Sequence, residues 1–594
     1  MMIKMLQMKT KRDKGMVRMN NKKQKLELTW IGKDREINLE PRILVEVPEK
    51  NYGDTNTENM LIHGDNLLAL KALEQDYSGK IKCIYIDPPY NTGSAFEHYD
   101  DNVEHSTWLS LMKARLEILK KLLSENGIIA VQIDKNEFAY LKILMDEIFG
   151  RNSYITTLSV RMSATSGYKI EHSDKTIVKN TEYIHIYAAQ YQNLKLKPAY
   201  EIATYDSHYS YILKKKVDSH EICQLIEEEV VISELNKYKL PKNSKSLTKL
   251  FMVSNIFRQF VNDNKEKIGR THTAPASALE KLEYFKTKLK SDKEVIEFIS
   301  AGGDKYYIKK TNNSLNQYIP ISLKYQMVDS YEGYSLQLSN ILGDWWDGFY
   351  LDMGNVENEG GVYFKASKKP ERLIFRILNM FTQKNDLILD SFLGSGTTAA
   401  VAHKMGRKWI GIELGDHCYT HCEPRLQRVV DGTDQGGISK AVNWQGGGGY
   451  KFYELAPSLL KKDEFGEWII EPKYDAEMLA EAMAKNEGYK YSPDGNNPYK
   501  QGYSTEKDFI FTTTQFITAE LLNKIQHELK EDESLLICTT HYEENCIDKF
   551  SNITVKKIPH SLLKRCEFGK LEYNLNVTEE EPRDTEDNDM EEDE

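Results

Sequence analysis

The sequence contains no long hydrophobic run and has few cysteines for its length. No stretch approaches the roughly 20 consecutive apolar residues that a membrane span requires, and the basic N-terminus lacks the apolar segment of a signal peptide. Seven cysteines, an odd number in 594 residues, do not make a disulfide framework. These absences exclude an integral membrane protein and a disulfide-stabilised secreted domain. They predict a cytoplasmic protein with reduced thiols and no membrane association.

The sequence also lacks an excess of positive charge, because its formal net charge at pH 7 is -11. The last residues, 578–594, hold eleven carboxylates and one arginine, which leaves the rest of the chain nearly neutral. We expect this acidic tail to be disordered, because it cannot bury enough apolar surface to offset chain entropy. Residues 237–249 carry five lysines and no acid, as a phosphate-facing surface would. A solvated lysine-rich loop is the alternative interpretation of this run.

The order of apolar segments predicts an α/β core that is interrupted once. Strands are expected at 60–65, 81–87 and 127–134, with a helix at 106–123 between them. Between about 161 and 345 the pattern gives way to polar, aromatic and lysine-rich sequence, which indicates an insertion. The α/β pattern resumes with a helix at 371–382, strands at 386–390 and 408–413, and a glycine-rich turn between these strands.

A low-complexity glycine run, Gly446–Gly449, is expected to separate this core from a C-terminal segment of about 130 residues. The length of the chain is too great for one ordinary core. The predicted architecture is a Rossmann-like, doubly wound α/β core with an inserted domain and an α+β C-terminal domain. The expected parts are a basic arm (1–55), the two core halves (56–160 and 346–430), the insertion (161–345), the C-terminal domain (431–577) and the acidic tail (578–594).

The segment Asp87-Pro88-Pro89-Tyr90 follows a buried strand, at the edge where parallel sheets bind ligands. Its residue types suit an exocyclic amine whose lone pair is delocalised into a ring. If the Asp87 carboxylate and the Pro88 carbonyl accept the N–H bonds, the nitrogen can present its lone pair to a methyl group. Two prolines fix that carbonyl in place, and Tyr90 can stack on a base flipped out of the duplex. A strand-ending turn with a surface tyrosine is the alternative.

The segment Asp390-Ser391-Phe392-Leu393-Gly394-Ser395-Gly396 also follows a strand and opens a helix. Its glycines let the backbone approach a ligand closely. Glu413 closes the next strand, where a carboxylate can bind ribose hydroxyls. A phosphate-binding P-loop is disfavoured because Thr397 stands where that motif requires lysine. A tight strand-to-helix turn without a ligand remains an alternative.

One cysteine and histidine cluster is discounted as a metal site. Residues 417–422 (HCYTHC) look like half of a zinc site, but no second cluster of matching spacing is evident. Ordinary helix packing is the preferred interpretation, and no metal is predicted.

Taken together, the two motifs resemble the β class of DNA amino-methyltransferases, in which the DPPY motif precedes the FxGxG motif. The resemblance covers nearly the whole length, and the chain is similar to the modification (Mod) subunit of type III restriction-modification systems. The stretches that carry it include IHGDNLLALKAL, IYIDPPYNTG, STWLSLM, TEYIHIYA, KKPERLI, DSFLGSGTTAAVAHKMGRKWIGIELGDHCYTHC and DQGGISKAVNWQGGGGYKFYEL.

The resemblance implies S-adenosylmethionine as the cofactor and assigns residues to it. Phe392, Gly394 and Gly396, in the loop that Asp390 begins, would cradle its methionine end, and Glu413 its ribose. Asp65 would bind the adenine amine of the cofactor, and Lys369, with Pro370, would border its amino-acid end. Many relatives have proline where Ser391 stands, and a serine there can still turn the chain.

The resemblance further implies transfer of a methyl group to N6 of a flipped adenine in double-stranded DNA, with Asp87, Pro88, Pro89 and Tyr90 as the catalytic residues. The insertion at 161–345 would be the target-recognition domain, and the C-terminal domain would serve dimerisation or partner binding. The resemblance implies a homodimer that can join a restriction helicase-nuclease subunit, and a solitary methyltransferase is the alternative. N4-cytosine methylation and a catalytically silent recognition subunit are the alternative functions.

Overall fold

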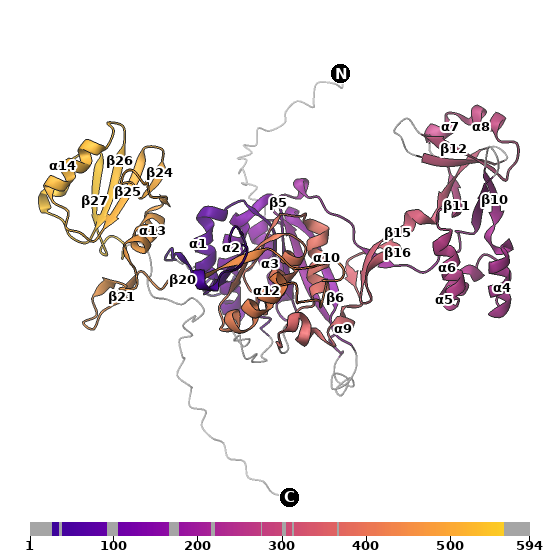
Figure 1. The fold of residues 1–594 in the computed structure, drawn as a ribbon, viewed down its shortest axis with the longest axis horizontal. Helices are drawn as coiled ribbons and strands as arrows, with labels where there is room; N and C mark the ends of the chain where they lie inside the picture. Colours follow the sequence, from indigo (N-terminus) through magenta and orange to yellow (C-terminus); the bar gives the residue numbers. More distant parts are fainter. Residues whose placement is uncertain are drawn as a thin grey trace, which may run out of the picture.

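The computed structural model describes residues 27–34, 39–91, 105–164, 177–215, 220–274, 276–299, 305–311, 314–364 and 368–563. The predicted acidic tail and most of the basic arm lie outside these ranges. Among the described helices, none is both long and apolar enough to cross a membrane. Figure 1 shows a central α/β unit with the inserted part on one side and the C-terminal part on the other.

An 11-stranded sheet forms the centre of the protein (Figure 1). Its strands from β20 to β5 run parallel, and β7 is antiparallel to both of its neighbours. In spatial order the strands are β1 (Leu44–Glu46), β20 (Gly449–Leu455), β3 (Met60–His63), β19 (Lys408–Glu413), β18 (Leu387–Asp390), β4 (Ile81–Ile86), β5 (Leu123–Ile133), β7 (Thr181–Ala188), β6 (Tyr154–Arg161) and β17 (Trp345–Trp346), with β2 (Tyr52–Gly53) paired to β20.

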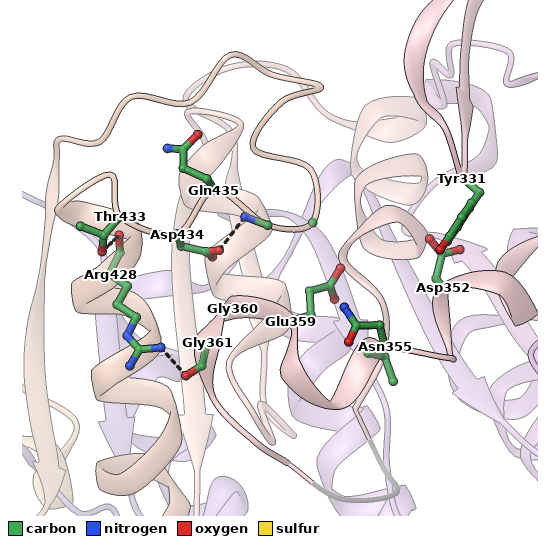
Figure 2. A pocket seen from close by; sticks show the side chains of 13 residues that line it. Tyr331, Asp352, Asn355, Glu359, Gly360, Gly361, Arg428, Thr433, Asp434 and Gln435 are labelled. Atoms are coloured by element: carbon green, nitrogen blue, oxygen red, sulfur yellow. Dashed lines mark hydrogen bonds between the residues drawn. The ribbon is translucent and has the colours of Figure 1, made fainter.

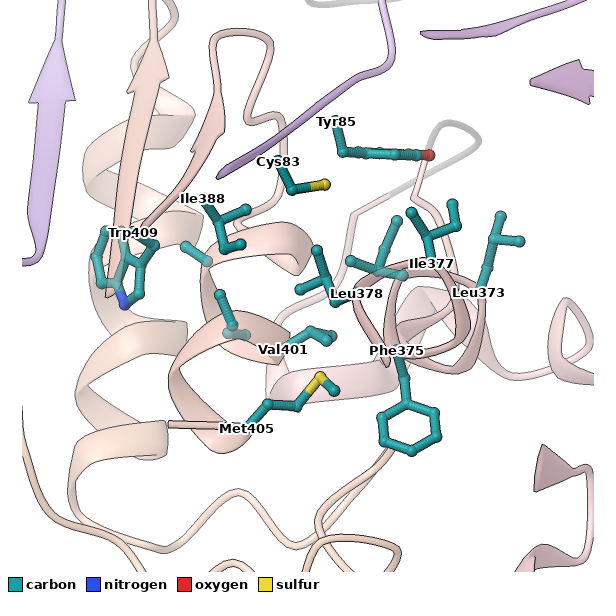
Figure 3. Packing of buried hydrophobic residues seen from close by; sticks show 14 of the residues in the cluster. Cys83, Tyr85, Leu373, Phe375, Ile377, Leu378, Ile388, Val401, Met405 and Trp409 are labelled. Atoms are coloured by element: carbon teal, nitrogen blue, oxygen red, sulfur yellow. The ribbon is translucent and has the colours of Figure 1, made fainter. Parts of the chain in front are cut away.

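Helices cover both faces of this sheet because successive strand residues point to opposite sides. Cys83 and Tyr85 of β4 pack with α10, α11 and α12, and Figure 3 shows this layer. Ile84 and Ile86 pack on the other face with α1, α2 and α3. The helices are α1 (Asn66–Tyr77), α2 (His105–Leu122), α3 (Phe138–Phe149), α10 (Glu371–Phe381), α11 (Thr397–Lys404) and α12 (Glu423–Val430). The predicted doubly wound core is confirmed.

Three predicted boundaries of the core are wrong. Strand β7 lies within the range assigned to the insertion, β20 within the C-terminal range and β1 within the basic arm, yet all three pair in the central sheet. β7 was missed because the polar and aromatic sequence around it masks its alternation. The inserted part that leaves the sheet therefore lies between β7 and β17, and the core continues to Leu455.

The glycine run is part of the core and does not separate two domains. Gly449 is the first residue of β20, which pairs with β2 and β3. A Cβ atom at Gly449 would lie 2.4 Å from the amide nitrogen of Asp54 and 2.5 Å from the carbonyl oxygen of Tyr52. Only glycine allows these backbones to pass so closely. Low sequence complexity here reflects close packing.

The inserted part is built on a closed six-stranded barrel, which leaves no free strand edge. A three-stranded sheet of β8 (Tyr200–Ile202), β15 (Tyr325–Ser330) and β16 (Gly333–Ile341) connects it to the core (Figure 1). The barrel strands are β9 (Tyr211–Lys215), β10 (His220–Gln224), β11 (Ile268–Thr273), β12 (Glu294–Ile299), β13 (Lys305–Lys310) and β14 (Leu315–Pro320). The helices are α4 (Glu229–Lys237), α5 (Ser246–Val253), α6 (Asn255–Asp263), α7 (Ala276–Leu279), α8 (Leu282–Lys288) and, where the chain re-enters the core, α9 (Phe349–Asp352).

The C-terminal part contains helices and a five-stranded sheet, in which antiparallel and parallel pairs are both present. A hairpin of β21 (Leu460–Lys462) and β22 (Trp468–Ile470) precedes it. The other elements are α13 (Ala476–Glu487), β23 (Lys490–Tyr491), β24 (Gly502–Thr505), β25 (Asp508–Thr513), α14 (Ala519–Glu528), β26 (Ser534–Thr539) and β27 (Ile553–Lys557).

A buried charge cluster fastens the inserted part to the core. Asp329 at the end of β15 lies 2.8 Å from the guanidinium of Arg376 and 4.0 Å from that of Arg372, both on α10. Arg372 also pairs with Asp352 of α9. Burial raises the pKa of Asp329, and the two arginines oppose this effect.

Replacing this carboxylate should weaken the attachment of the inserted part. Asp329→Ala leaves the buried guanidinium of Arg376 without its carboxylate partner, which costs about 3 kcal/mol, whereas Arg372 keeps Asp352. We expect thermolysin to cleave the connecting strands faster in this variant than in the wild type. Glu332→Ala, at the exposed turn of the same hairpin, is the matched control and should be cleaved at the wild-type rate. Equal cleavage of all three proteins would contradict the proposed attachment.

Candidate active site

The two predicted motifs meet at one edge of the central sheet. Strands β4 and β18 are parallel neighbours, with Ile84 opposite Leu389. Their carboxyl ends therefore lie side by side, although Asp87 and Asp390 are about 300 residues apart in the chain. Strands β19 and β3 continue the same parallel order. The loops after all four strands consequently share the edge at which doubly wound sheets bind ligands.

Asp87 and Tyr90 belong to a four-residue cluster of hydrogen bonds and charges. The hydroxyl of Tyr90 donates to Oδ1 of Asp87 at 2.7 Å and to Oε2 of Glu182 at 2.8 Å. Nζ of Lys369 lies 2.7 Å from Oδ2 of Asp87 and 3.7 Å from Oε2 of Glu182. The same ammonium lies 5.0 Å from the centre of the Tyr90 ring. Two carboxylates thus share one ammonium and one hydroxyl.

The protonation of these groups follows from burial and mutual charge. Burial raises the pKa of Asp87, and the charge of Lys369 only partly opposes this. Burial also favours neutral Glu182, but Lys369 and the hydrogen bonds from Gln132 and Tyr90 outweigh it and lower that pKa. Burial raises the pKa of Tyr90 well above its usual value. Tyr90 is therefore a neutral hydrogen-bond donor, and Asp87 is the carboxylate that takes up a proton more readily.

The two prolines hold the turn after β4 in a defined position. Pro88 is buried, and the carbonyl oxygen of Pro89 accepts a hydrogen bond from Nε1 of Trp108 at 2.8 Å. Trp108 is itself buried in the first turns of α2. The packing of this helix therefore fixes the main chain beside Asp87, as the predicted role of the Pro88 carbonyl requires.

The glycine loop after β18 bonds to the carboxylate that closes β19. The amide of Gly394 donates to Oε2 of Glu413 at 2.6 Å, and that of Phe392 donates to Oδ1 of Asp390 at 2.9 Å. Gly394 has a φ of 58°, and a Cβ atom there would meet nothing within 4 Å. Gly396 caps the N-terminus of α11. The loop thus leaves open space above a backbone that favours glycine.

Carboxylates accumulate at this edge. Burial raises the pKa of Asp390 from 3.8 to about 7, and the charges of Asp87 and Glu413 contribute to the increase. Burial acts in the same direction on Glu413, but hydrogen bonds from His417, Gly415 and Gly394 outweigh it and lower its pKa. An edge with this charge fits a cationic ligand that also carries hydroxyl groups.

Two residues predicted to bind the cofactor, Asp65 and Lys369, contact other protein groups in this structure, and their cofactor roles stay predictions. Oδ1 of Asp65 caps helix α1 by accepting the amides of Leu67 and Leu68 at 2.9 and 3.1 Å. Its other oxygen lies 3.7 Å from the guanidinium of Arg115. Lys369 contacts Asp87, which belongs to the predicted catalytic loop. The structure therefore places Lys369 with the catalytic residues and gives Asp65 a capping role.

Sequence analysis missed residues that organise the site. Glu182 is the one carboxylate in strand β7, and this was the only signal for it in the sequence. Its oxygen Oε2 also accepts Nε2 of Gln132 at 2.6 Å. Nδ2 of Asn66 donates to the carbonyl oxygen of Ser391 at 2.7 Å and so joins the loops after β3 and β18. No sequence motif predicted a role in the site for Gln132 or Asn66.

The HCYTHC segment supports the core and the glycine loop. Cys418 and Cys422 are buried in the hydrophobic cluster of α10 to α12. Sγ of Cys422 lies 3.0 Å from the carbonyl oxygen of Gly394, and Nε2 of His417 lies 2.9 Å from Oε1 of Glu413. Within the described ranges, no group of three or more histidine, cysteine or acidic side chains is arranged to hold a metal ion.

A polar cavity of about 500 Å³ lies beside the core where the inserted part joins it (Figure 2). Asp352, Glu359, Arg428 and Asp434 line it, together with Tyr331 at the turn between β15 and β16. Burial, with the charge of Glu371, raises the pKa of Glu359 to about 7. The cavity is lined by none of the predicted site residues, so it is separate from the edge that carries Asp87.

Comparison with protein families identifies the chain. The family model described as "DNA methylase" (N6_N4_Mtase) matches residues 81–279 and 250–423. The chain belongs to this DNA methylase family. The matched ranges include strands β4, β18 and β19 with the loops that follow them, so the family assignment covers both motifs.

Curated relatives of this chain include Mod subunits. The chain is 38% identical over 424 residues to a Haemophilus influenzae protein named "Probable type III restriction-modification enzyme HindVI Mod subunit", covering 69% of this chain and 55% of that protein. It is 27% identical over 438 residues to the type III restriction-modification enzyme EcoPI Mod subunit of Escherichia phage P1, covering 64% and 61%. The chain thus spans just over half the length of these relatives.

Solved structures with similarity to this chain include the PvuII DNA methyltransferase (cytosine-N4-specific), which is 14% identical with a TM-score of 0.29. That match covers 66% of this chain and 95% of the other. The M1.HpyAVI-SAM complex is 13% identical with a TM-score of 0.28, covering 62% and 98%. These scores are low, and the fold assignment rests on the strand order described above.

The raised pKa of Asp390 predicts a specific dependence of stability on pH. The folded state binds this proton more tightly than the unfolded chain, so the free energy of unfolding decreases as the pH rises from about 4 to about 7. Asp390→Asn removes this titration. Relative to the variant, the wild type should lose about 2 kcal/mol between pH 5 and pH 8, measured by urea unfolding. A difference between the two proteins that stays constant with pH would contradict the assignment.

Proposed function

We propose that this protein is a DNA methyltransferase that transfers a methyl group from S-adenosylmethionine to N6 of a flipped adenine. The observation that carries the proposal is the Asp87-Pro88-Pro89-Tyr90 loop beside the glycine loop at one sheet edge. Membership of the DNA methylase family supports methyl transfer to DNA. The Mod subunits among its relatives support a place in a type III restriction-modification system.

The residues at the edge fit the cofactor in charge and in shape. Asp390 and Glu413 are buried carboxylates that favour a ligand with positive charge and hydroxyl groups. Gly394 leaves space above the loop backbone. In this proposal the loop from Phe392 to Gly396 holds the methionine end and Glu413 the ribose. S-adenosylmethionine, when bound, supplies a methyl group on a cationic sulfur that becomes a neutral thioether.

The loop from Asp87 to Tyr90 can overcome the weak nucleophilicity of the target amine. An exocyclic amine is a weak nucleophile because its lone pair is delocalised into the ring. Asp87 and the Pro88 carbonyl accept its two N–H bonds, which lets the nitrogen turn its lone pair toward the methyl group. Asp87, with its raised pKa, takes up the proton that the nitrogen loses when the N–C bond forms. Tyr90 holds the flipped base by stacking.

The inserted part is the proposed DNA-recognition domain. Its five lysines between Lys237 and Lys249 are all exposed, on and between helices α4 and α5. Exposed lysines of this density suit contacts with backbone phosphates. The proposed partners are a second copy of this chain and a restriction helicase-nuclease subunit, and the C-terminal part is the proposed contact for them. The Mod subunits among the relatives support this proposal.

A methyl-transfer assay with paired variants tests the function. Unmethylated genomic DNA is incubated with the enzyme and labelled cofactor, and the methylated nucleoside is identified after digestion. We expect N6-methyladenine from the wild type. Asp87→Asn should lower the rate about a hundredfold to a thousandfold, because the amide cannot accept both the N–H bond and the proton.

The control for this variant is Asp134→Asn. Asp134 is a buried carboxylate directly after β5, the neighbour of β4, and it pairs with Lys179 at 2.6 Å. The Asp134→Asn variant should retain methyl-transfer activity within about threefold of the wild type. Recovery of N4-methylcytosine would reassign the target base. Equal methyl transfer by the wild type and Asp87→Asn, or none by either, would overturn the proposed function.

A further inference from the structure

The side chain of Lys369 contacts both groups that would bind the target base in the proposed reaction, Asp87 and the ring of Tyr90. Nζ of Lys369 lies 2.7 Å from Oδ2 of Asp87, where the amine of the base would donate its hydrogen bond. It also lies 5.0 Å from the centre of the Tyr90 ring, against which the base would stack. The ammonium therefore imitates the target base in both contacts. It must leave Asp87 before a base can enter.

A second acceptor for this ammonium lies close by. Oε2 of Glu182 is 3.7 Å from Nζ of Lys369, so a rotation of the lysine side chain is enough to exchange one carboxylate for the other. Glu182 also accepts the hydroxyl of Tyr90 at 2.8 Å. Tyr90 and Lys369 are thus both bound to Asp87 and both within reach of Glu182.

The position of Glu182 is fixed by the sheet. Strand β7 pairs with β5 on one side and β6 on the other, so its backbone cannot move without breaking two ladders. Gln132 of β5 donates to Oε2 of Glu182 at 2.6 Å and orients the carboxylate. Lys369 lies two residues before the start of helix α10, whose Arg372 and Arg376 are bound to Asp329. The moving part is therefore the lysine side chain, between two fixed carboxylates.

We propose that Glu182 is a positioning residue that receives Lys369, and keeps Tyr90, when the target base enters, so that Asp87 becomes available to the amine. The proposal rests on the proposed function of the same site. The exchange keeps the ammonium paired with a carboxylate in both states, and in the loaded site Asp87 receives the N–H of the amine in its place. In the empty site the lysine occupies Asp87, and in the loaded site it pairs with Glu182.

A pair of substitutions tests this exchange. Glu182→Gln keeps an oxygen that can accept hydrogen bonds from Tyr90 and Gln132, but it loses the charge that would attract Lys369. The lysine then stays on Asp87, and we expect kcat for methyl transfer to fall about tenfold or more. In the double variant Glu182→Gln/Lys369→Met no ammonium occupies Asp87. Its kcat should exceed that of Glu182→Gln alone.

Base entry can be followed separately from chemistry. The target site is first located by sequencing DNA that the wild type has modified. A duplex with 2-aminopurine at the target position then increases in fluorescence when that base leaves the stack. Without cofactor, we expect Glu182→Gln to reduce this increase and the double variant to restore it. Lys369→Met alone should increase the signal at least to the wild-type level.

Glu487→Gln is the matched control, because Glu487 is a buried glutamate that pairs with Lys556 at 2.6 Å in the C-terminal part. The kcat and the fluorescence increase of the Glu487→Gln variant should equal those of the wild type. The proposal is overturned if Glu182→Gln retains the wild-type kcat, or if the double variant is as slow as Glu182→Gln with no recovery of fluorescence. Loss of the proposed function gives a different result, namely a wild type that transfers no methyl group.

Discussion

The parallel pairing of β4 with β18 is the constraint on which the candidate site depends. It brings the ends of two strands together from the two halves of a divided core. The chain enters the inserted part after β7 and returns to the sheet at β17. Both strands lie on the side of the sheet opposite β20. A large domain can therefore be accommodated without disturbing the edge where Asp87 and Asp390 meet. The same arrangement keeps the proposed recognition domain covalently close to the chemistry.

Charged residues at and just before the start of helix α10 connect this edge with the rest of the protein. Lys369, just before its N-terminus, reaches Asp87. Glu371 is buried and binds Arg425, whose guanidinium donates to Oγ1 of Thr397 next to the glycine loop. Arg372 and Arg376 bind the hairpin that carries the inserted part. The segment from Lys369 to Arg376 thus contacts the Asp87–Tyr90 loop and the inserted part directly, and it reaches the glycine loop through Arg425.

Much of the core and of the two motifs could be predicted from sequence because both follow local rules. The strands ending at Asp87 and Glu413 are apolar runs with clear ends, and the glycine loop follows its strand directly. The core limits could not be predicted in the same way. β20 joins the sheet by pairing with strands from the start of the chain, whereas β7 pairs with the two strands before it but lies among polar and aromatic sequence. Glu182 was missed for a related reason. Its role depends on which strand lies beside β5, and that is a property of the fold.

The charge of this sheet edge indicates that the proposed enzyme binds its cofactor and its DNA with different parts of the protein. This edge gathers four carboxylates, Asp87, Glu182, Asp390 and Glu413, and Lys369 contacts the first two of them. Such an edge attracts a cationic cofactor and repels the phosphates of DNA. Affinity for DNA must therefore come from elsewhere, and the exposed lysines of the inserted part supply the opposite charge. Lys369 then has a second role in the proposed reaction, because its charge partly offsets the repulsion at the one point where a nucleotide must approach the carboxylates.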